Sequence, residues 1–141
     1  MTVKMNAAAL NAFMALEFPQ VDGDFTVEEA TEEGVKIRMN IADKHLRPGG
    51  TVSGPSMFAL ADVSIYFAIL SQIGPEALTV TTNCSIDFMR KPAAGRDLIA
   101  HAHLHKLGRV LAVGDVLLYS EGSDKPVARA SLTYSIPPVK A

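Results

Sequence analysis

The sequence predicts an α+β fold, in which a curved antiparallel sheet of about six strands wraps around one long central helix, with a short helix at the N-terminus. Three observations lead to this expectation. Residues 51–73 are apolar on every side of a helix, as in a buried helix. The segments before and after it alternate apolar and polar residues, as half-buried strands do. A single apolar helix beside such strands is best buried if the sheet curls around it.

The central helix is marked at both ends. Gly54 and Pro55 suit its start, because a proline in the first turn loses no helical hydrogen bond, and Gly74 followed by Pro75 stops it. The uninterrupted apolar run is shorter than the ~20 residues of a membrane span and contains Asp62. We therefore expect this helix to form the core of a globular domain and not to cross a membrane.

The remaining elements follow from periodicity and turn residues. A helix over residues 6–17 ends before Pro19, and Leu107-Gly108 is the tight turn of a hairpin. The last four strands can form an antiparallel meander. The expected strands are 24–30, 34–41, 77–89, 97–106, 109–119 and 126–136.

The strand at 77–89 separates into an apolar and a polar face if its alternation is regular. Cys84 then lies on the apolar face and Thr81 on the polar one. The apolar set is Leu78, Val80, Thr82, Cys84, Ile86 and Phe88, and the polar set is Thr79, Thr81, Asn83, Ser85 and Asp87.

Composition limits the class of protein. The 141 residues are 48% hydrophobic and 20% charged, which fits one globular domain spanning 1–141. A net charge of −2 gives no general attraction to nucleic acid or anionic membranes. The single Cys84 excludes an intrachain disulfide. The N-terminus resembles an amphipathic helix and not a signal peptide, so we expect a cytoplasmic protein.

Asp62 is the candidate for chemistry. It is the only charged residue between Arg47 and Glu76, and it lies in the middle of the apolar helix. A carboxylate there must be paired, hydrogen-bonded, protonated or used in a reaction. An aspartate that only bonds a neighbour is the commoner case, and the residues around Asp62 decide between the two.

Two short motifs resemble the His-Gly-Gly and Leu-x-Asp signature of the hotdog-fold acyl-CoA thioesterases, and in particular the phenylacetate-degradation group. They are Ser53-Gly54-Pro55 and Leu60-Ala61-Asp62. Residues 81–92 and 106–113 resemble the family's third strand and the hairpin that follows it. The resemblance runs from about residue 38 to 136 and implies a hotdog fold and paired subunits, often as dimers of dimers.

The resemblance also implies roles for individual residues. The Gly54 amide matches the donor to the thioester carbonyl, and Asp62 matches the residue that attacks this carbonyl or activates water. Thr81 matches a hydroxyl that helps to hold the water. The sequence departs from the family where Ser53 replaces the histidine, Pro55 the second glycine, and Arg47 an asparagine of the preceding loop.

Helix geometry adds a constraint on the site. Gly54 and Asp62 are eight residues apart, which is roughly 12 Å along a helix axis. One carbonyl group cannot meet both residues of the same chain. We therefore expect a homodimer with two composite sites, each combining Gly54 of one subunit with Asp62 of the other. The sequence leaves open whether Asp62 acts as base or nucleophile.

Basic residues near strand ends and turns could hold the phosphates of coenzyme A, which enters as part of the substrate and not as a separate cofactor. Ser53 is either a helix cap or a substrate contact, and Tyr66 packs in the core or lines an acyl pocket. The substrate-binding candidates are Arg47, Ser53, Tyr66, Asn83, Arg90, Lys91, Lys106 and Arg109.

Other chemistry is less favoured by the sequence. His101, His103 and His105 have the spacing of metal ligands on one strand face, but no carboxylate is evident nearby, so no metal site is predicted. Cys84 on an apolar face is expected to be a buried, inert thiol. Ser53 and Ser56 lack the nucleophile-elbow pattern of serine hydrolases.

Taken together, these features predict a cytoplasmic acyl-CoA thioesterase acting on an aryl or a short or medium acyl group. The alternative is a non-catalytic acyl-CoA binding or sensing protein of the same fold. A hotdog hydratase or dehydratase is a third possibility, but such enzymes usually use a histidine that the helix region here lacks.

Overall fold

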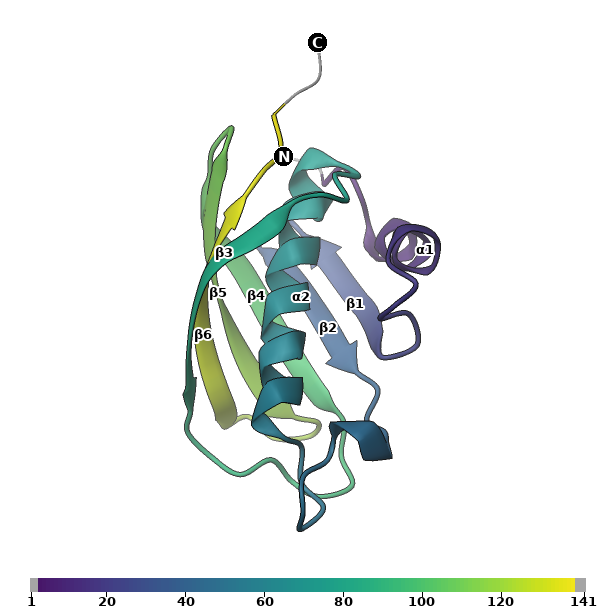
Figure 1. Ribbon diagram of the computed structural model, residues 1–141, viewed down its shortest axis with the longest axis vertical. Helices are drawn as coiled ribbons and strands as arrows, with labels where there is room; N and C mark the ends of the chain where they lie inside the picture. The colour runs from purple at the N-terminus through teal and green to yellow at the C-terminus, as the bar shows by residue number, and fades with distance from the viewer. Residues whose placement is uncertain (1–2, 139–141) are drawn as a thin grey trace.

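The structure is a computed structural model that describes residues 3–138 (Figure 1). One antiparallel sheet curls around the long helix α2, and α1 packs beside β1. This confirms the predicted fold. The elements are α1 (Ala7–Glu17), β1 (Phe25–Thr31), β2 (Gly34–Met39), the 3-10 helix η1 (Asp43–His45), α2 (Gly54–Ile73), β3 (Val80–Phe88), β4 (Leu98–Leu107), β5 (Leu111–Ser120) and β6 (Pro126–Ser135).

The strand order corrects the predicted meander. The sheet runs β1-β2-β4-β5-β6-β3, so of the last four strands only β4, β5 and β6 form a meander, and β3 pairs with β6 at the far edge. After β3 the chain crosses the end of the sheet through residues 89–97 and enters β4 beside β2 (Figure 1). A long connection of this kind separates two strands that a tight turn would have paired.

Helix α2 forms the core because its side chains are apolar on all sides. Leu60, Phe67 and Leu70 are fully buried, and burial of such a side chain contributes about 1.5–3 kcal/mol. By length and composition α2 could also cross a membrane, but 67% of its most apolar window is buried within the fold. Its head is capped by Ser53, whose Oγ accepts the Ser56 N–H at 3.3 Å.

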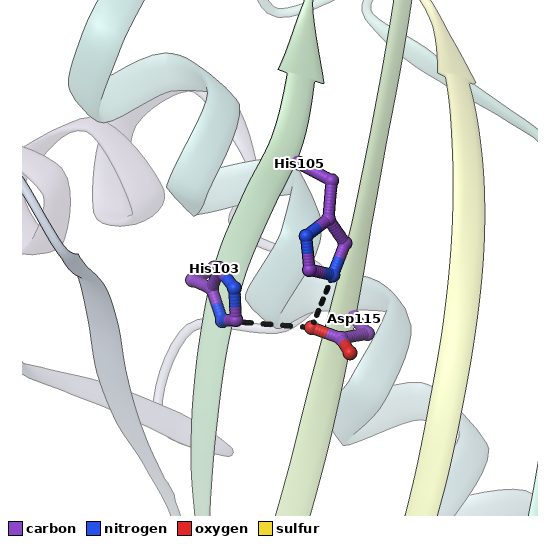
Figure 2. A group of neighbouring side chains, drawn as sticks. All are labelled: His103, His105 and Asp115. Carbon is purple, nitrogen blue, oxygen red and sulfur yellow. Dashed lines mark ion pairs between the residues drawn. The ribbon is translucent and has the colours of Figure 1, made fainter.

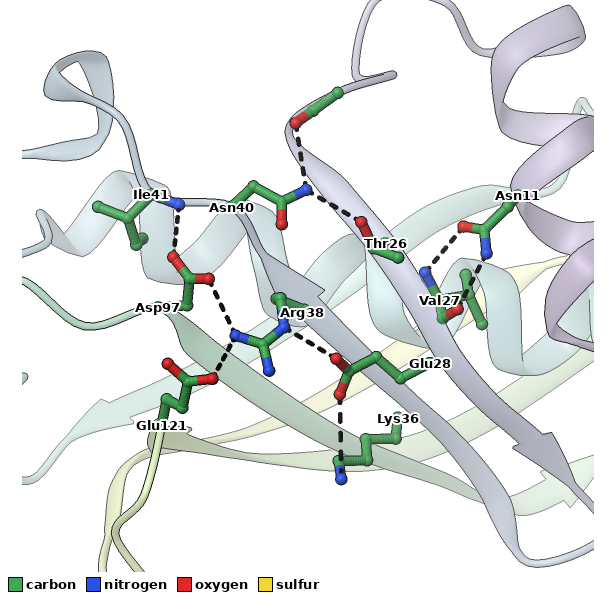
Figure 3. Close-up of polar contacts among 11 residues, drawn as sticks. Asn11, Thr26, Val27, Glu28, Lys36, Arg38, Asn40, Ile41, Asp97 and Glu121 are labelled. Atoms are coloured by element: carbon green, nitrogen blue, oxygen red, sulfur yellow. Dashed lines mark hydrogen bonds and ion pairs between the residues drawn. The ribbon is translucent and has the colours of Figure 1, made fainter.

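The β1 edge of the sheet is covered by α1 (Figure 3). Asn11 of α1 donates to the Val27 carbonyl at 2.9 Å and accepts the Val27 N–H at 2.8 Å. These bonds occupy main-chain groups that an edge strand would otherwise leave free for another chain. At the opposite edge, Val80 and Phe88 of β3 are 56% and 52% exposed.

A charged cluster around Arg38 fixes the chain where it leaves β2 (Figure 3). The Arg38 guanidinium bonds Glu28 at 2.8 Å, Asp97 at 2.9 Å and Glu121 at 2.7 Å. Asp97 also accepts the Ile41 N–H at 3.0 Å. The cluster thereby joins β1, β2 and the ends of β4 and β5, and it anchors the loop that leads to the head of α2.

Candidate active site

The Asp62 carboxylate is held by two hydroxyl groups from the sheet. Thr81 Oγ1 donates to Asp62 Oδ1 at 2.5 Å, and the Tyr134 hydroxyl lies 2.6 Å from the same oxygen and 2.7 Å from the Asp62 carbonyl oxygen. Within residues 3–138, no hydrogen bond is made to Asp62 Oδ2. One carboxylate oxygen is therefore fixed while the other can meet a water molecule or a substrate.

Thr81 reaches Asp62 because of a β-bulge, which corrects the predicted faces of this strand. The β3–β6 register shifts between Thr81 and Asn83, so Thr81 pairs with Tyr134 and Cys84 pairs with Leu132. Tyr134 and Leu132 both face the core, so Thr81 and Cys84 share the inner face and are not on opposite faces as predicted. A bulge re-aims side chains in this way by inserting one residue into a strand.

Tyr134 is a site residue that sequence reasoning missed. It is only 2% exposed, and burial followed by the negative charge of Asp62 raises the pKa of its hydroxyl, which stays protonated and available as a donor. The signal was present in the sequence, because a buried tyrosine hydroxyl needs a partner and Tyr134 falls on the inward face of the last strand.

A cavity of ≈ 180 Å³ lies beside Asp62. Tyr66 lines this cavity, and its hydroxyl donates to the Ala77 carbonyl at 2.9 Å. Burial raises the pKa of Tyr66 to about 12. Thr79 also lines this cavity, and its buried Oγ1 has no hydrogen-bond partner among residues 3–138. The full lining is Phe18, Asp62, Val63, Tyr66, Ala77, Thr79, Val80, Thr81 and Tyr134.

A second cavity, of ≈ 400 Å³, lies at the head of α2. It is lined by Gly54 and by three basic residues that were among the predicted substrate-binding residues, Arg47, Arg90 and Lys91. A methyl group on Gly54 would lie 3.5 Å from the Phe88 ring, so this ring packs directly over the glycine. Within the described residues nothing accepts the Gly54 N–H, as is usual for the first N–H groups of a helix.

Gly54 and Asp62 line separate cavities of one chain, as the helix spacing requires. The remaining predicted residues are more scattered. Ser53 serves as the helix cap, and Asn83 is exposed on β3 and lines neither cavity. Lys106 and Arg109 lie at the β4–β5 hairpin, at the opposite end of the molecule from the head of α2 (Figure 1). Their contact with substrate stays a prediction.

Cys84 is half-buried and not fully buried as predicted. Burial and the nearby Asp62 charge raise the pKa of its thiol, so the thiolate is disfavoured. This agrees with an inert cysteine and gives no support to a cysteine nucleophile.

Comparison with known proteins defines the class. The model of the thioesterase superfamily matches residues 49–127, which include Gly54, Asp62 and Thr81. The chain therefore belongs to the thioesterase superfamily and is a hydrolase of this class. This confirms the family that the sequence motifs indicated.

Individual relatives agree with this assignment. A crystal structure of a candidate thioesterase from Silicibacter sp. TM1040 is 56% identical, covers 98% of this chain and 96% of its own, and has a TM-score of 0.91. Human acyl-coenzyme A thioesterase 13 is 28% identical over 120 residues, 84% of each chain. A mutant of phenylacetic acid degradation protein PaaI from Thermus thermophilus is 28% identical, covers 84% of this chain and 99% of its own, and has a TM-score of 0.72.

Proposed function

We propose that this hydrolase cleaves an acyl-CoA to a free acid and CoA, at a composite site made by two subunits. The observation that carries the proposal is the state of Asp62, with one oxygen held by Thr81 and Tyr134 and the other unpartnered within the described residues. Hydroxyl donors orient a carboxylate without pairing its charge, so its second oxygen stays free to accept a proton from water.

In the proposed reaction, Asp62 Oδ2 takes a proton from a water molecule as the water oxygen bonds to the acyl carbon. The carbonyl oxygen becomes an oxyanion, which the Gly54 N–H of the second subunit and the positive end of α2 stabilise. Collapse of this intermediate breaks the C–S bond, and the CoA sulfur leaves and takes up a proton. Direct attack by Oδ2, followed by hydrolysis of the anhydride, is the alternative route.

The exposed β3 edge supports the subunit arrangement. Asn11 and α1 cover the β1 edge, whereas β3 presents Val80 and Phe88 to solvent. Pairing of two β3 edges would cover these side chains and extend the sheet. Because Thr81 lies on β3 and Phe88 packs over Gly54, a second subunit at this edge adjoins both halves of the site.

The two cavities suggest where the CoA part and the acyl part of the substrate bind. Arg47, Arg90 and Lys91 at the Gly54 cavity suit the phosphates of CoA. The cavity beside Asp62 is small and lined by Phe18, Tyr66 and other largely apolar groups, which suits an aryl or a short acyl group. Placement of the protein in the cytoplasm stays a prediction.

A mixed-dimer experiment tests the composite site. Asp62→Asn and Gly54→Val are each expected to be inactive, the second because a branched side chain blocks approach to the amide. In a dimer of one subunit of each kind, one site has an intact Gly54 and an intact Asp62. Co-refolding equal amounts should restore about one quarter of wild-type thiol release, because half the dimers are mixed and each has one intact site.

The controls decide how failure is interpreted. Each variant refolded alone should stay inactive, and each should elute as the same dimer by light scattering. Inactivity of the mixture despite proven mixed dimers would place both groups of each site in one chain. Wild-type thiol release by Asp62→Asn alone would instead remove Asp62 from the chemistry.

A further inference from the structure

A cluster of three metal-ligating side chains lies away from the active site, on the outer face of the sheet. Figure 2 shows His103 and His105 of β4 pointing toward Asp115 of β5. Asp115 Oδ1 is 3.0 Å from His105 Nε2 and 3.5 Å from His103 Nδ1. The three ligand atoms all lie within 4.8 Å of one another. No carboxylate was expected beside these histidines, but strand pairing places Asp115 directly opposite His103.

A β-bulge brings the two histidines together. The β4–β5 register shifts between Leu104 and Lys106, which makes His105 the extra residue of the strand. Side chains two residues apart on a regular strand are roughly 6.5 Å apart. The rings of His103 and His105 are 4.5 Å apart between centroids and inclined at 69°. The bulge thus turns both rings toward one point above Asp115.

The distances suit a small transition-metal ion. Bonds of about 2.1 Å from a tetrahedral ion to imidazole nitrogen and carboxylate oxygen place neighbouring ligand atoms ~3.4 Å apart. The two observed oxygen–nitrogen distances, 3.0 and 3.5 Å, lie on either side of this value. The ligand side chains are 49–54% exposed, so an ion can enter and a water molecule can complete its coordination.

The surroundings add negative charge. His103 and Asp115 line a groove of ≈ 360 Å³ together with Glu29 and Glu33, and Lys36 is the one lysine or arginine among the described residues of the lining. Net negative charge in a groove raises the local concentration of cations.

We propose that His103, His105 and Asp115 form a binding site for one divalent transition-metal ion of the Zn²⁺ or Ni²⁺ class. Imidazole and carboxylate together favour such ions over Mg²⁺ and Ca²⁺, which prefer oxygen ligands alone. The site is independent of the hydrolytic chemistry, because none of its residues lines the Asp62 or the Gly54 cavity.

The experiment is a calorimetric titration of the tag-free, chelator-treated full chain with Zn²⁺, Ni²⁺ and Mg²⁺. One Zn²⁺ or Ni²⁺ ion should bind per chain, and Mg²⁺ should not bind. His103→Asn, His105→Asn and Asp115→Asn should each weaken metal binding by about 100-fold. Mutation of a residue that only hydrogen-bonds to a metal ligand lowers metal affinity by about 10–100-fold, and loss of a ligand itself should lie at the upper end of this range.

His101→Asn is the matched control. His101 lies on the same strand and the same face, but its ring packs edge-on against Tyr119 at 5.2 Å and lies outside the cluster. This variant should bind the metal as the wild type does. Absence of a Zn²⁺ or Ni²⁺ signal, or equal weakening by His101→Asn and by the cluster variants, would overturn the proposal. Co²⁺ substitution should give visible absorption bands that His105→Asn abolishes.

Discussion

Asp62 and Asp115 are two carboxylates held in similar ways in different surroundings. Each has one oxygen that faces two side chains at hydrogen-bond or ion-pair distance, and in each case one of these partners lies at a β-bulge. The partners of Asp62 are the hydroxyls of Thr81 and Tyr134, at 2.5 and 2.6 Å, and these contacts are partly buried. The partners of Asp115 are two imidazoles at 3.0 and 3.5 Å on an exposed face.

The difference lies in what the partners do to the negative charge. Hydroxyls carry no positive charge, so they fix the position of the Asp62 carboxylate without pairing its charge. Imidazoles either pair with Asp115 as cations or share a metal ion with it. A bulge that re-aims a partner of a carboxylate thus accompanies the proposed base in one place and the proposed metal ligand in the other.

Neutralising Asp62 and Asp115 in turn should give the largest difference between the two regions. Asp62→Asn should lower kcat for acyl-CoA hydrolysis by about 10²–10⁴-fold, the usual contribution of a general base. Asp115→Asn should leave kcat unchanged while it weakens metal binding by about 100-fold. Free-thiol release from phenylacetyl-, butyryl- and octanoyl-CoA measures the first effect. A similar loss of kcat in both variants would contradict the functional separation of the two carboxylates.

The contribution of the two hydroxyl donors, Thr81 and Tyr134, can be tested without removing the Asp62 carboxylate. Tyr134→Phe removes one donor to Asp62, and loss of a hydrogen bond to a charged group costs about 1.5–3 kcal/mol. We expect kcat for acyl-CoA hydrolysis to fall by about tenfold, because the carboxylate loses one of the two groups that fix its position. Tyr119→Phe, on the outer face, is the control.

An unchanged kcat in Tyr134→Phe would limit Tyr134 to packing. Thr81 offers a parallel test of the second donor. Thr81→Ser keeps the hydroxyl and should retain most activity, whereas Thr81→Val removes it and should reproduce the effect of Tyr134→Phe.

Periodicity and capping residues were sufficient to predict α2, the number of strands and the position of Asp62. Arg90 and Lys91 were predicted to hold CoA together with Lys106 and Arg109, but they share a cavity with Arg47 instead. Neither bulge was predicted, because a strict two-residue alternation contains no information on an inserted residue. The pairing of β3 with β6 and the approach of Asp115 to His103 depend on partners distant in sequence, which local patterns do not specify.

Alkaline pH should weaken the fold through the tyrosines around Asp62. Burial raises the pKa of Tyr66 to about 12, whereas an unfolded tyrosine has a pKa of about 10. Between these values the unfolded chain has lost a proton that the folded chain keeps, so the free energy of unfolding falls as pH rises from about 10 to about 12. Urea denaturation at pH 8 and pH 11 measures this, and Tyr66→Phe should show a shallower decline.

The smallest expected effect concerns Thr79, which lines the Asp62 cavity with a buried and unpartnered hydroxyl among residues 3–138. An unpartnered buried hydroxyl costs about 1–3 kcal/mol, so Thr79→Val should raise the free energy of unfolding by about 1 kcal/mol once imperfect packing is included. Urea denaturation at fixed protein concentration measures the change. Thr26→Val, at an exposed hydroxyl that accepts a bond from Asn40, should give no gain. Destabilisation by Thr79→Val would instead show that the hydroxyl has a partner in solution, and lost thiol release in a stable Thr79→Val protein would identify that partner as the attacking water or the acyl group.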